Sequence, residues 1–204
     1  MSKHFTFDDI MQLPSRYRGN LMNKVSGFKP ANLIGTKSKV GQTNLAVFNS
    51  VMHIGANPPY LGFILRPTTV ERHTYENIKE TGVYTINQIT TKIHQQAHKT
   101  SAKYGRDVSE FDAVGLTEFY QKEFHAPFVE ESRIKIGLSF QEEHLMQCNG
   151  TRLVIGKVEH LILPEEAILE DGDVVLEDLD TAAVAGLYNY YKPEHLGKYG
   201  YEKP

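Results

Sequence analysis

The feature that most constrains the fold is a pair of long β-type segments joined by a short turn. Residues 133–147 alternate apolar and polar side chains, and a period of two places the apolar ones on one face of a strand. These apolar positions are Ile134, Ile136, Leu138 and Phe140. After a turn at Cys148-Asn149-Gly150, a second β-type run extends to Pro164. The sequence therefore predicts a long β-hairpin.

Shorter β-type runs precede this hairpin, at residues 31–36, 44–52, 60–66 and 83–89. Turn residues separate them, including the break at Asn57-Pro58-Pro59. Many short strands joined by Gly, Asn and Pro turns are typical of a closed or partly closed barrel. The predicted fold class is therefore mainly β (α+β), a barrel with a few short peripheral helices.

Two separate helices are expected, over residues 74–81 and 91–102. Thr74 is a suitable N-cap for the first, and Thr81-Gly82 is a suitable stop, because glycine tolerates the left-handed conformation that ends many helices. Two helices among so many strands do not give the strict alternation of a doubly wound sheet. Residues 105–132 are expected to form a long connection with local helix.

The composition predicts one globular domain, residues 1–204, with a core over about 20–195. The net charge is -3 without a basic stripe, which argues against nucleic-acid binding. One cysteine excludes an internal disulfide and favours a reducing compartment. No run approaches the roughly 18 apolar residues of a membrane span, and the N-terminus lacks the apolar segment of a signal peptide. We therefore expect a cytoplasmic protein without membrane contact.

The first candidate site is the polar-apolar strand at residues 44–50. With a period of two, Leu45, Val47, Asn49 and Val51 lie on one face, and Asn44, Ala46, Phe48 and Ser50 on the other. Neither face is cleanly polar. Such a strand can line a site for a flat heterocycle, which needs an apolar wall and a few placed amides and hydroxyls. Alternatively, its Asn and Ser side chains only satisfy backbone groups of a turn.

The second candidate site is the segment RPTTVERHT at residues 66–74, directly before a predicted helix. It gathers hydrogen-bond donors on Arg66, Thr68, Thr69, Arg72, His73 and Thr74. A helix N-terminus with free N–H groups and nearby guanidinium and hydroxyl groups can bind a phosphate. The alternative is an ordinary capped helix behind a polar loop.

Other polar groups give weaker signals. His94 and His98 have the i, i+4 spacing of metal ligands but no evident third ligand, so a solvated helix face is the simpler interpretation and no metal site is predicted. Glu142, Glu143 and His144 are expected to be solvent-exposed charges at a strand end. Cys148 is expected to be an idle thiol, and the tyrosines of 188–191 to serve in packing. The sequence contains no GxGxxG, P-loop, HExxH, CxxC or GxSxG motif, and it indicates no catalytic residue.

The order of these pieces resembles the flavin reductase-like family of FMN-binding split barrels, which includes the flavoredoxins. The resemblance rests on NLAVFNSVMHIGANPPYLGFILRP at 44–67 and RHTYENIKETGVYTINQI at 72–89. Later matching pieces are SEFDAVGLT at 109–117, LVIGKVEHLIL at 153–163 and Gly186-Leu187-Tyr188. Each motif is short, but their order over most of the chain is fairly specific.

The resemblance implies a homodimer that holds FMN at its interface. It places the flavin ring against Ala46, Val47, Phe48, Asn49 and Ser50, and the phosphate near residues 66–74. The implied activity is NAD(P)H:flavin reductase, with hydride passing from NADH or NADPH through the bound flavin. The sequence does not distinguish FMN from FAD. Two alternatives remain open at this point: an FMN-binding electron carrier reduced by a redox partner protein, and a flavin-free binding protein on the same barrel.

Overall fold

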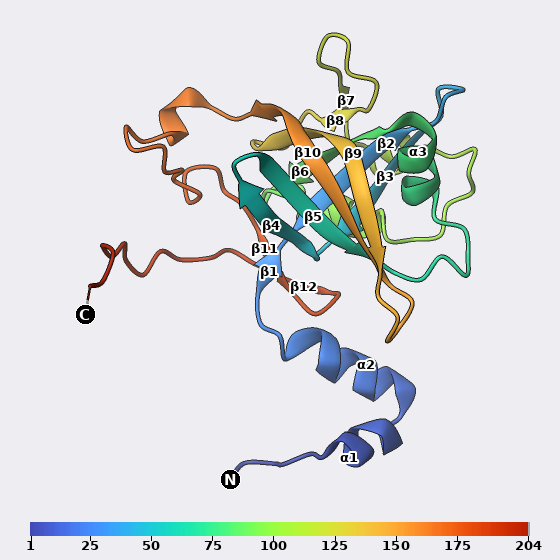
Figure 1. Cartoon of the computed structure of the whole chain (residues 1–204), viewed down its shortest axis with the longest axis vertical. Coiled ribbons are helices and arrows are strands. Elements are labelled where there is room, and N and C mark those ends of the chain that lie inside the picture. The colour runs from blue at the N-terminus through green and yellow to red at the C-terminus, as the bar shows by residue number, and fades with distance from the viewer. Residues whose placement is uncertain (204) are drawn as a thin grey trace.

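The structure is a computed structural model that describes residues 1–203, and its centre is one curled antiparallel sheet (Figure 1). The strands of this sheet are β2 (Asn32–Lys37), β3 (Thr43–Phe48), β4 (Val51–Ala56), β5 (Pro59–Leu65), β6 (Val83–Gln88), β9 (Lys135–Leu145) and β10 (Arg152–Ile162). Their order is β3-β2-β6-β9-β10-β5-β4. Only Asn49 and Ser50 join the two edge strands β3 and β4, so the sheet must curl until its edges nearly meet. The prediction of a mainly β barrel is confirmed.

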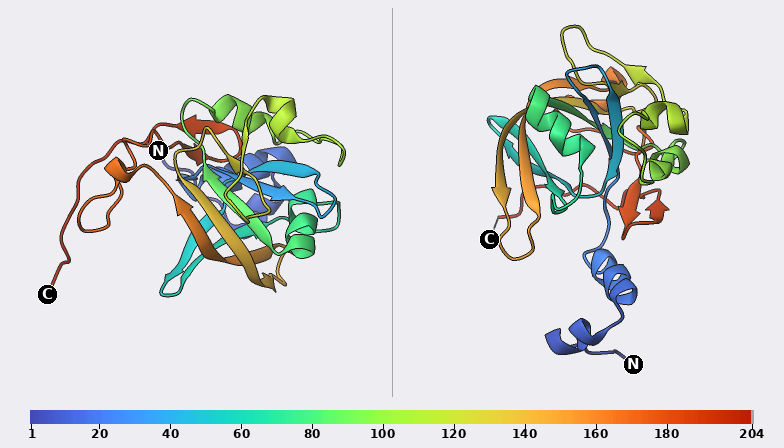
Figure 2. Two further views of the ribbon diagram at one scale, coloured as in Figure 1. Left: turned by 90° about the horizontal axis from the view of Figure 1, so that it is seen from above. Right: turned by 90° about the vertical axis from the view of Figure 1, so that its right-hand side faces the viewer.

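Smaller elements surround this barrel. The helices are α1 (Phe7–Gln12), α2 (Ser15–Lys24), α3 (His73–Thr81), α4 (His94–Lys99) and α5 (Glu110–Val114), with a 3-10 turn at Glu165–Ala167. The short strands are β1 (Lys29–Pro30), β11 (Ala183–Ala185) and β12 (Asn189–Tyr191), which form one small sheet, and the pair β7 (Glu118–Phe119) and β8 (Phe128–Val129). Helices α4 and α5 lie over the outer face of β3, whereas α3 covers one end of the barrel (Figure 2). No helix among residues 1–203 combines the length and apolar character required to cross a membrane.

Two apolar clusters hold these layers together. One fills the barrel and includes Ile34, Phe63, Tyr84, Leu138 and Val154. The other lies between the outer face of the β2–β3 pair and helices α4 and α5, and it includes Leu33, Leu45, Ile89, Ala97 and Phe111. Successive residues of β2 and β3 therefore serve opposite clusters, as strand periodicity requires. Strand β3, the first candidate site, is apolar on both faces for this reason.

The predicted hairpin is confirmed. Strands β9 and β10 pair in antiparallel register from Arg152↔Leu145 to Ile162↔Lys135, and the turn lies where Cys148-Asn149-Gly150 predicted it. The Asn57-Pro58-Pro59 break is also confirmed as the turn between β4 and β5, with a cis Asn57–Pro58 bond.

Three boundaries were predicted wrongly. The run at 44–52 is not one strand, because Asn49 and Ser50 leave the sheet and reverse the chain into β4. Val51 consequently joins Phe48 in the barrel cluster instead of sharing a face with Leu45. The helix at 74–81 begins one residue earlier, so Arg72 and not Thr74 is its N-cap, although Gly82 ends it in the left-handed conformation at φ 77° as predicted. The helix at 91–102 is shorter, His94–Lys99, because Ile93 and Thr100 are its caps.

Candidate functional site

The outer edge of β3 is the feature around which a site can be built. The Leu45 N–H donates to the Glu110 carboxylate at 2.9 Å, so it points away from β2. Backbone groups of an antiparallel strand face alternate sides, and the N–H and C=O of Val47 therefore point to the same open edge. Within residues 1–203, no group outside the sheet makes a hydrogen bond to these two Val47 groups. They form a free donor and acceptor pair beside the turn.

The first half of this edge is closed. Ser109, at the start of α5, donates to the Thr43 hydroxyl at 2.7 Å, and that hydroxyl donates to Glu118 at 2.6 Å. Glu110 from the same helix covers Leu45. Helix α5 and its flanks therefore cover the edge strand up to Leu45, and they leave the portion from Val47 onward open, where Val47 and Phe48 are half-buried, as is Ala46 before them.

Asn49 and Ser50 stabilise the turn that ends the strand. The Asn49 amide donates to the Gly186 carbonyl at 2.8 Å. The Ser50 hydroxyl donates to the Ile64 carbonyl at 2.9 Å and accepts from the Ile64 N–H at 3.2 Å. These donors are used inside the chain, as the alternative interpretation of the segment expects. The Asn49 side-chain oxygen, Oδ1, makes no hydrogen bond within the described residues and is still available to a ligand.

The donor-rich segment 66–74 divides into two parts. Arg66, Thr68 and Thr69 are exposed, and their side chains make no hydrogen bond in the described part of the chain. Arg72, in contrast, donates from Nε to the Pro67 carbonyl at 3.3 Å, and Thr74 is buried. The Thr74 hydroxyl accepts from the Asn44 amide at 2.9 Å, so it joins α3 to β3.

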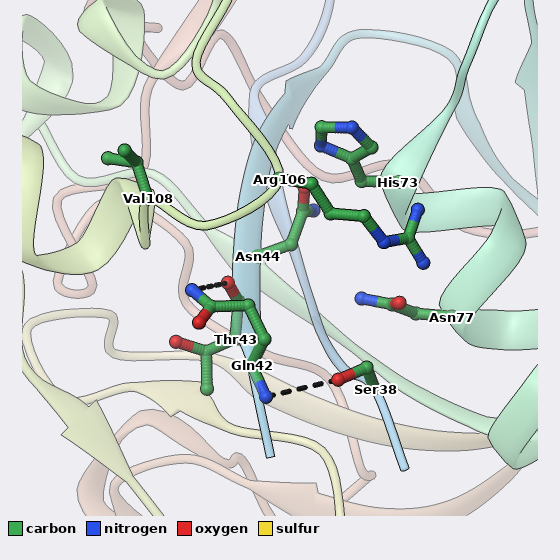
Figure 3. A pocket seen from close by; sticks show the side chains of 8 residues that line it. All are labelled: Ser38, Gln42, Thr43, Asn44, His73, Asn77, Arg106 and Val108. Carbon is green, nitrogen blue, oxygen red and sulfur yellow. Dashed lines mark hydrogen bonds between the residues drawn. The ribbon is translucent and has the colours of Figure 1, made fainter. Parts of the chain in front are cut away.

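His73, the first residue of α3, lines a small pocket (Figure 3). The pocket is lined by Ser38, Gln42, Thr43, Asn44, His73, Asn77, Arg106 and Val108. Arg106 forms an ion pair with Glu76, and Asn77 donates to Thr36 at 3.1 Å. Burial alone would raise the pKa of Glu76, but the Arg72 N–H and the Arg106 guanidinium lower it below its usual range. The sequence did not indicate this pocket, because Arg106 lies in a loop about thirty residues from α3.

Glu110 is the most deeply buried carboxylate at this edge, with 6% of the residue exposed. Burial raises its pKa, whereas the Leu45 N–H, its own N–H and the nearby His73 lower it, and the net direction is upward. The motif SEFDAVGLT contains this residue, but the sequence alone did not mark it as a contact of the candidate strand.

One further polar atom lies beside the candidate strand. Asn32 is 2% exposed and pairs with Phe48 in the β2–β3 register, yet its side-chain Nδ2 has no hydrogen-bond partner in the structure of residues 1–203. Buried donors are normally paired, so this amide is suited to an acceptor brought by a ligand.

The remaining sequence candidates lie elsewhere. His94 and His98 are half-buried and contact the ring of Tyr190 at centroid distances of 5.8 and 5.7 Å, which corrects the prediction of a solvated face. Among residues 1–203 no group of three His, Cys, Asp or Glu side chains is placed to hold a metal ion. Glu143 is not exposed as predicted, because Tyr75 and Arg152 donate to it at 3.0 and 3.1 Å. Cys148 is exposed in the hairpin turn.

The edge strands β3 and β4 of the curled sheet are joined only by a two-residue turn, and the donor-rich segment 66–74 is tied to β3 through the Asn44–Thr74 hydrogen bond. This arrangement defines the chain as a split-barrel protein. Residues 28–179 match the model of the flavin reductase like domain, and the chain belongs to that family. The family prediction made from the sequence motifs is thereby confirmed, and membership marks the chain as a flavin-related oxidoreductase.

Solved structures agree with this assignment. A flavin reductase candidate with a split-barrel domain from Shewanella frigidimarina NCIMB 400 is 45% identical, with a TM-score of 0.95 over 98% of this chain and 100% of that one. Nitrilotriacetate monooxygenase component B from Bacillus cereus is 19% identical, with a TM-score of 0.85 over 97% of this chain and 100% of that one. Flavoredoxin of Desulfovibrio vulgaris (Miyazaki F) is 24% identical, with a TM-score of 0.71 over 84% and 90% of the two chains. The last two show the shared fold.

Proposed function

We propose that this chain is an FMN-dependent NAD(P)H:flavin reductase that holds FMN along the open edge of β3 and works as a homodimer. The observation that carries the proposal is the free N–H and C=O of Val47 beside a half-buried apolar strand. The pyrimidine side of an isoalloxazine ring presents carbonyl oxygens and one N–H, which such a pair complements. Ala46, Val47 and Phe48 would form the apolar wall against which the ring rests.

The phosphate of FMN would lie at the segment 66–74. Arg66 supplies a guanidinium and Thr68 and Thr69 supply hydroxyls, all of them exposed. Helix α3 adds its first backbone N–H groups at His73 and Thr74, since the N–H groups of a first helical turn have no partner within the helix. Arg72 and Thr74 would act by fixing the loop and the helix, because their side chains already bond within the chain.

The protein's own part in the reaction is to bind and orient. Bound FMN would supply the hydride-transfer chemistry with NADH or NADPH. The β3 edge would fix the ring plane, and the half-buried wall would exclude water from one ring face. No general acid or base is required for this transfer, which agrees with a site that lacks a catalytic dyad.

The test is optical. Purified protein titrated with FMN should show bound flavin in its visible spectrum, and the complex should oxidise NADH or NADPH. Flavin binding without oxidation of either nucleotide would refute the reductase and favour an electron carrier, which a partner reductase would then reduce. A protein that takes up no FMN would refute the flavin site and leave a binding protein on the same barrel.

Asn32→Leu tests whether the buried amide beside Phe48 meets the flavin. The substitution is expected to weaken FMN binding about tenfold, because a hydrogen bond to the ligand is lost. It should not lower the free energy of unfolding of the flavin-free protein, since Nδ2 has no partner there. Isothermal titration with FMN and urea denaturation measure the two effects.

Tyr84→Phe is the matched control for this substitution. The Tyr84 hydroxyl is also buried without a partner among residues 1–203, but it lies inside the barrel cluster between Phe63 and Gly156. Its removal should leave FMN affinity unchanged. Equal FMN affinities in wild type and Asn32→Leu would show that the Asn32 amide does not contact the cofactor.

A further inference from the structure

The two N-terminal helices contribute no fully buried residue to their own chain. Neither α1 nor α2 contains a buried residue, and Phe7, Val25 and Phe28 are 75%, 65% and 68% exposed. Figures 1 and 2 show this segment, residues 1–28, extending away from the barrel. We call it the arm. Helices of 6 and 10 residues are marginal in water without tertiary packing, so an isolated arm would not hold its helices.

Helix α2 presents an apolar face suited to packing. Tyr17, Leu21 and Val25 follow one another at intervals of four residues and therefore lie on one side of the helix axis. Arg16, Asn20 and Lys24 lie on other sides of the helix. A helix with this pattern normally lays its apolar face on another surface.

The barrel carries an unusual apolar surface on the outside of β4, β5 and β10. Val51, Phe63 and Val154 point into the barrel, so the residues between them point outward. The outward residues that are not buried are Met52, Ile54, Ile64 and Leu153, which we call the outer face. Gly62 lies at the centre of the outer face and has no side chain. Ile54 and Leu153 close over it, each 3.1 Å from the place where a Cβ on Gly62 would lie.

An outward sheet face of this kind is expected to be polar. Met52 and Ile54 are instead 39% and 40% exposed. Contiguous exposed apolar surface of this kind marks an interaction site. The arm of the same chain does not cover it, because the arm leaves the barrel in another direction (Figures 1 and 2).

We propose that the arm of one copy packs on the outer face of a second copy of this chain. Both surfaces are apolar and open, and both belong to the same chain. In a two-fold dimer the arm of each copy would therefore cover the outer face of the other copy. Gly27, in the left-handed conformation at φ 82°, joins the arm to β1 and gives it a bend that most residues would resist.

The Shewanella structure supports an arm that keeps one fixed position relative to the barrel. The arm is about one seventh of the chain, so a TM-score of 0.95 over 98% of the chain requires the arms to superpose. A crystal of a protein 45% identical therefore keeps the arm in the same extended position. Within its own chain the arm is held only at its root, where Phe28 packs on Tyr191 at a ring-centroid distance of 4.8 Å, and its helices contain no buried residue. We therefore expect another molecule to cover the helices when they keep this position.

The pairing also bears on the flavin site, a consequence that rests on the proposed function. A Cβ on Gly186 would lie 3.8 Å from Lys24 at the end of α2, and the Gly186 carbonyl accepts from Asn49. The root of the arm thus borders the turn after β3. A docked partner would lie beside the edge assigned to the ring.

Sedimentation velocity of the full chain without flavin tests the pairing. Wild type is expected to sediment as a dimer, and Leu21→Asp on the arm and Ile54→Asp on the outer face should each weaken dimerisation tenfold or more. Asn20→Asp, on another side of α2, and Val40→Asp, at a 93% exposed apolar residue in the β2–β3 turn, should leave the dimer intact. A monomeric wild type, or a dimer unaffected by both substitutions, would overturn the proposal.

A mixture of the two variants distinguishes arm-to-face from arm-to-arm packing. Ile54→Asp retains an intact arm and Leu21→Asp retains an intact outer face, so mixing them should restore dimers through one arm–face contact. Absence of mixed dimers would contradict the pairing. Because this measurement uses flavin-free protein, its outcome is independent of whether FMN binds.

Discussion

Gly35→Ala is expected to lower the free energy of unfolding by about 3 kcal/mol, at the upper end of the usual cost of overpacking. Gly35 lies in the middle of β2, between Leu45 of β3 and Thr85 of β6. A Cβ there would lie 2.3 Å from the Pro127 carbonyl oxygen and 2.6 Å from the Thr85 hydroxyl. Neither can retreat easily, because that hydroxyl donates to the same carbonyl at 2.6 Å.

Urea denaturation of wild type and variant measures this effect. Gly19→Ala is the control, since nothing lies within 4 Å of its Cβ position in α2 and alanine favours helix. It should leave stability unchanged or raise it by up to about 1 kcal/mol. A loss below about 1 kcal/mol in Gly35→Ala would show that the β2 environment relaxes readily.

The close approach at Gly35 also shows what the sequence could not predict. Pro127 lies in the segment 105–132, which was predicted as a long connection with local helix and without any assigned contact to β2. Its carbonyl meets β2 across about ninety residues of chain, and no local pattern encodes such a contact. Local signals did predict the β9–β10 hairpin, the turn at Pro58-Pro59 and the helix stop at Gly82, because each depends on residues that are neighbours in sequence.

The candidate site divides in the same way. The alternation over 44–52 predicted the apolar wall of β3 but not its end at Asn49, because nothing in the apolar pattern marks the turn. The density of hydrogen-bond donors predicted a phosphate site at residues 66–74. Only the structure shows that Arg66 is exposed whereas the Thr74 side chain is buried and bonded to Asn44. Glu110 closes the edge of β3 from sixty-five residues away, so no local pattern predicted its role.

Glu110→Ala is expected to lower the free energy of unfolding by about 2 kcal/mol, because the buried Leu45 N–H loses its acceptor. Glu110→Gln retains a side-chain oxygen that can accept this bond, and it should be the milder change. If the same edge holds FMN, Glu110→Ala should also weaken FMN binding by loosening β3, whereas Glu110→Gln should not. Urea denaturation and FMN titration of both variants measure these effects.

The pH dependence of Glu110→Gln gives the sharper comparison. Burial raises the pKa of Glu110, so the folded protein holds this proton more tightly than the unfolded chain does. Its contribution to stability is complete below the unfolded pKa of about 4.3 and is lost as pH rises through the folded value. Stability measured from pH 4 to pH 8 should therefore fall in wild type relative to Glu110→Gln. The prediction is contradicted if the difference in free energy of unfolding between the two proteins stays constant, or if wild type gains stability relative to Glu110→Gln as pH rises. Either result would show that the Leu45 N–H and His73 outweigh burial and hold the carboxylate in its charged form.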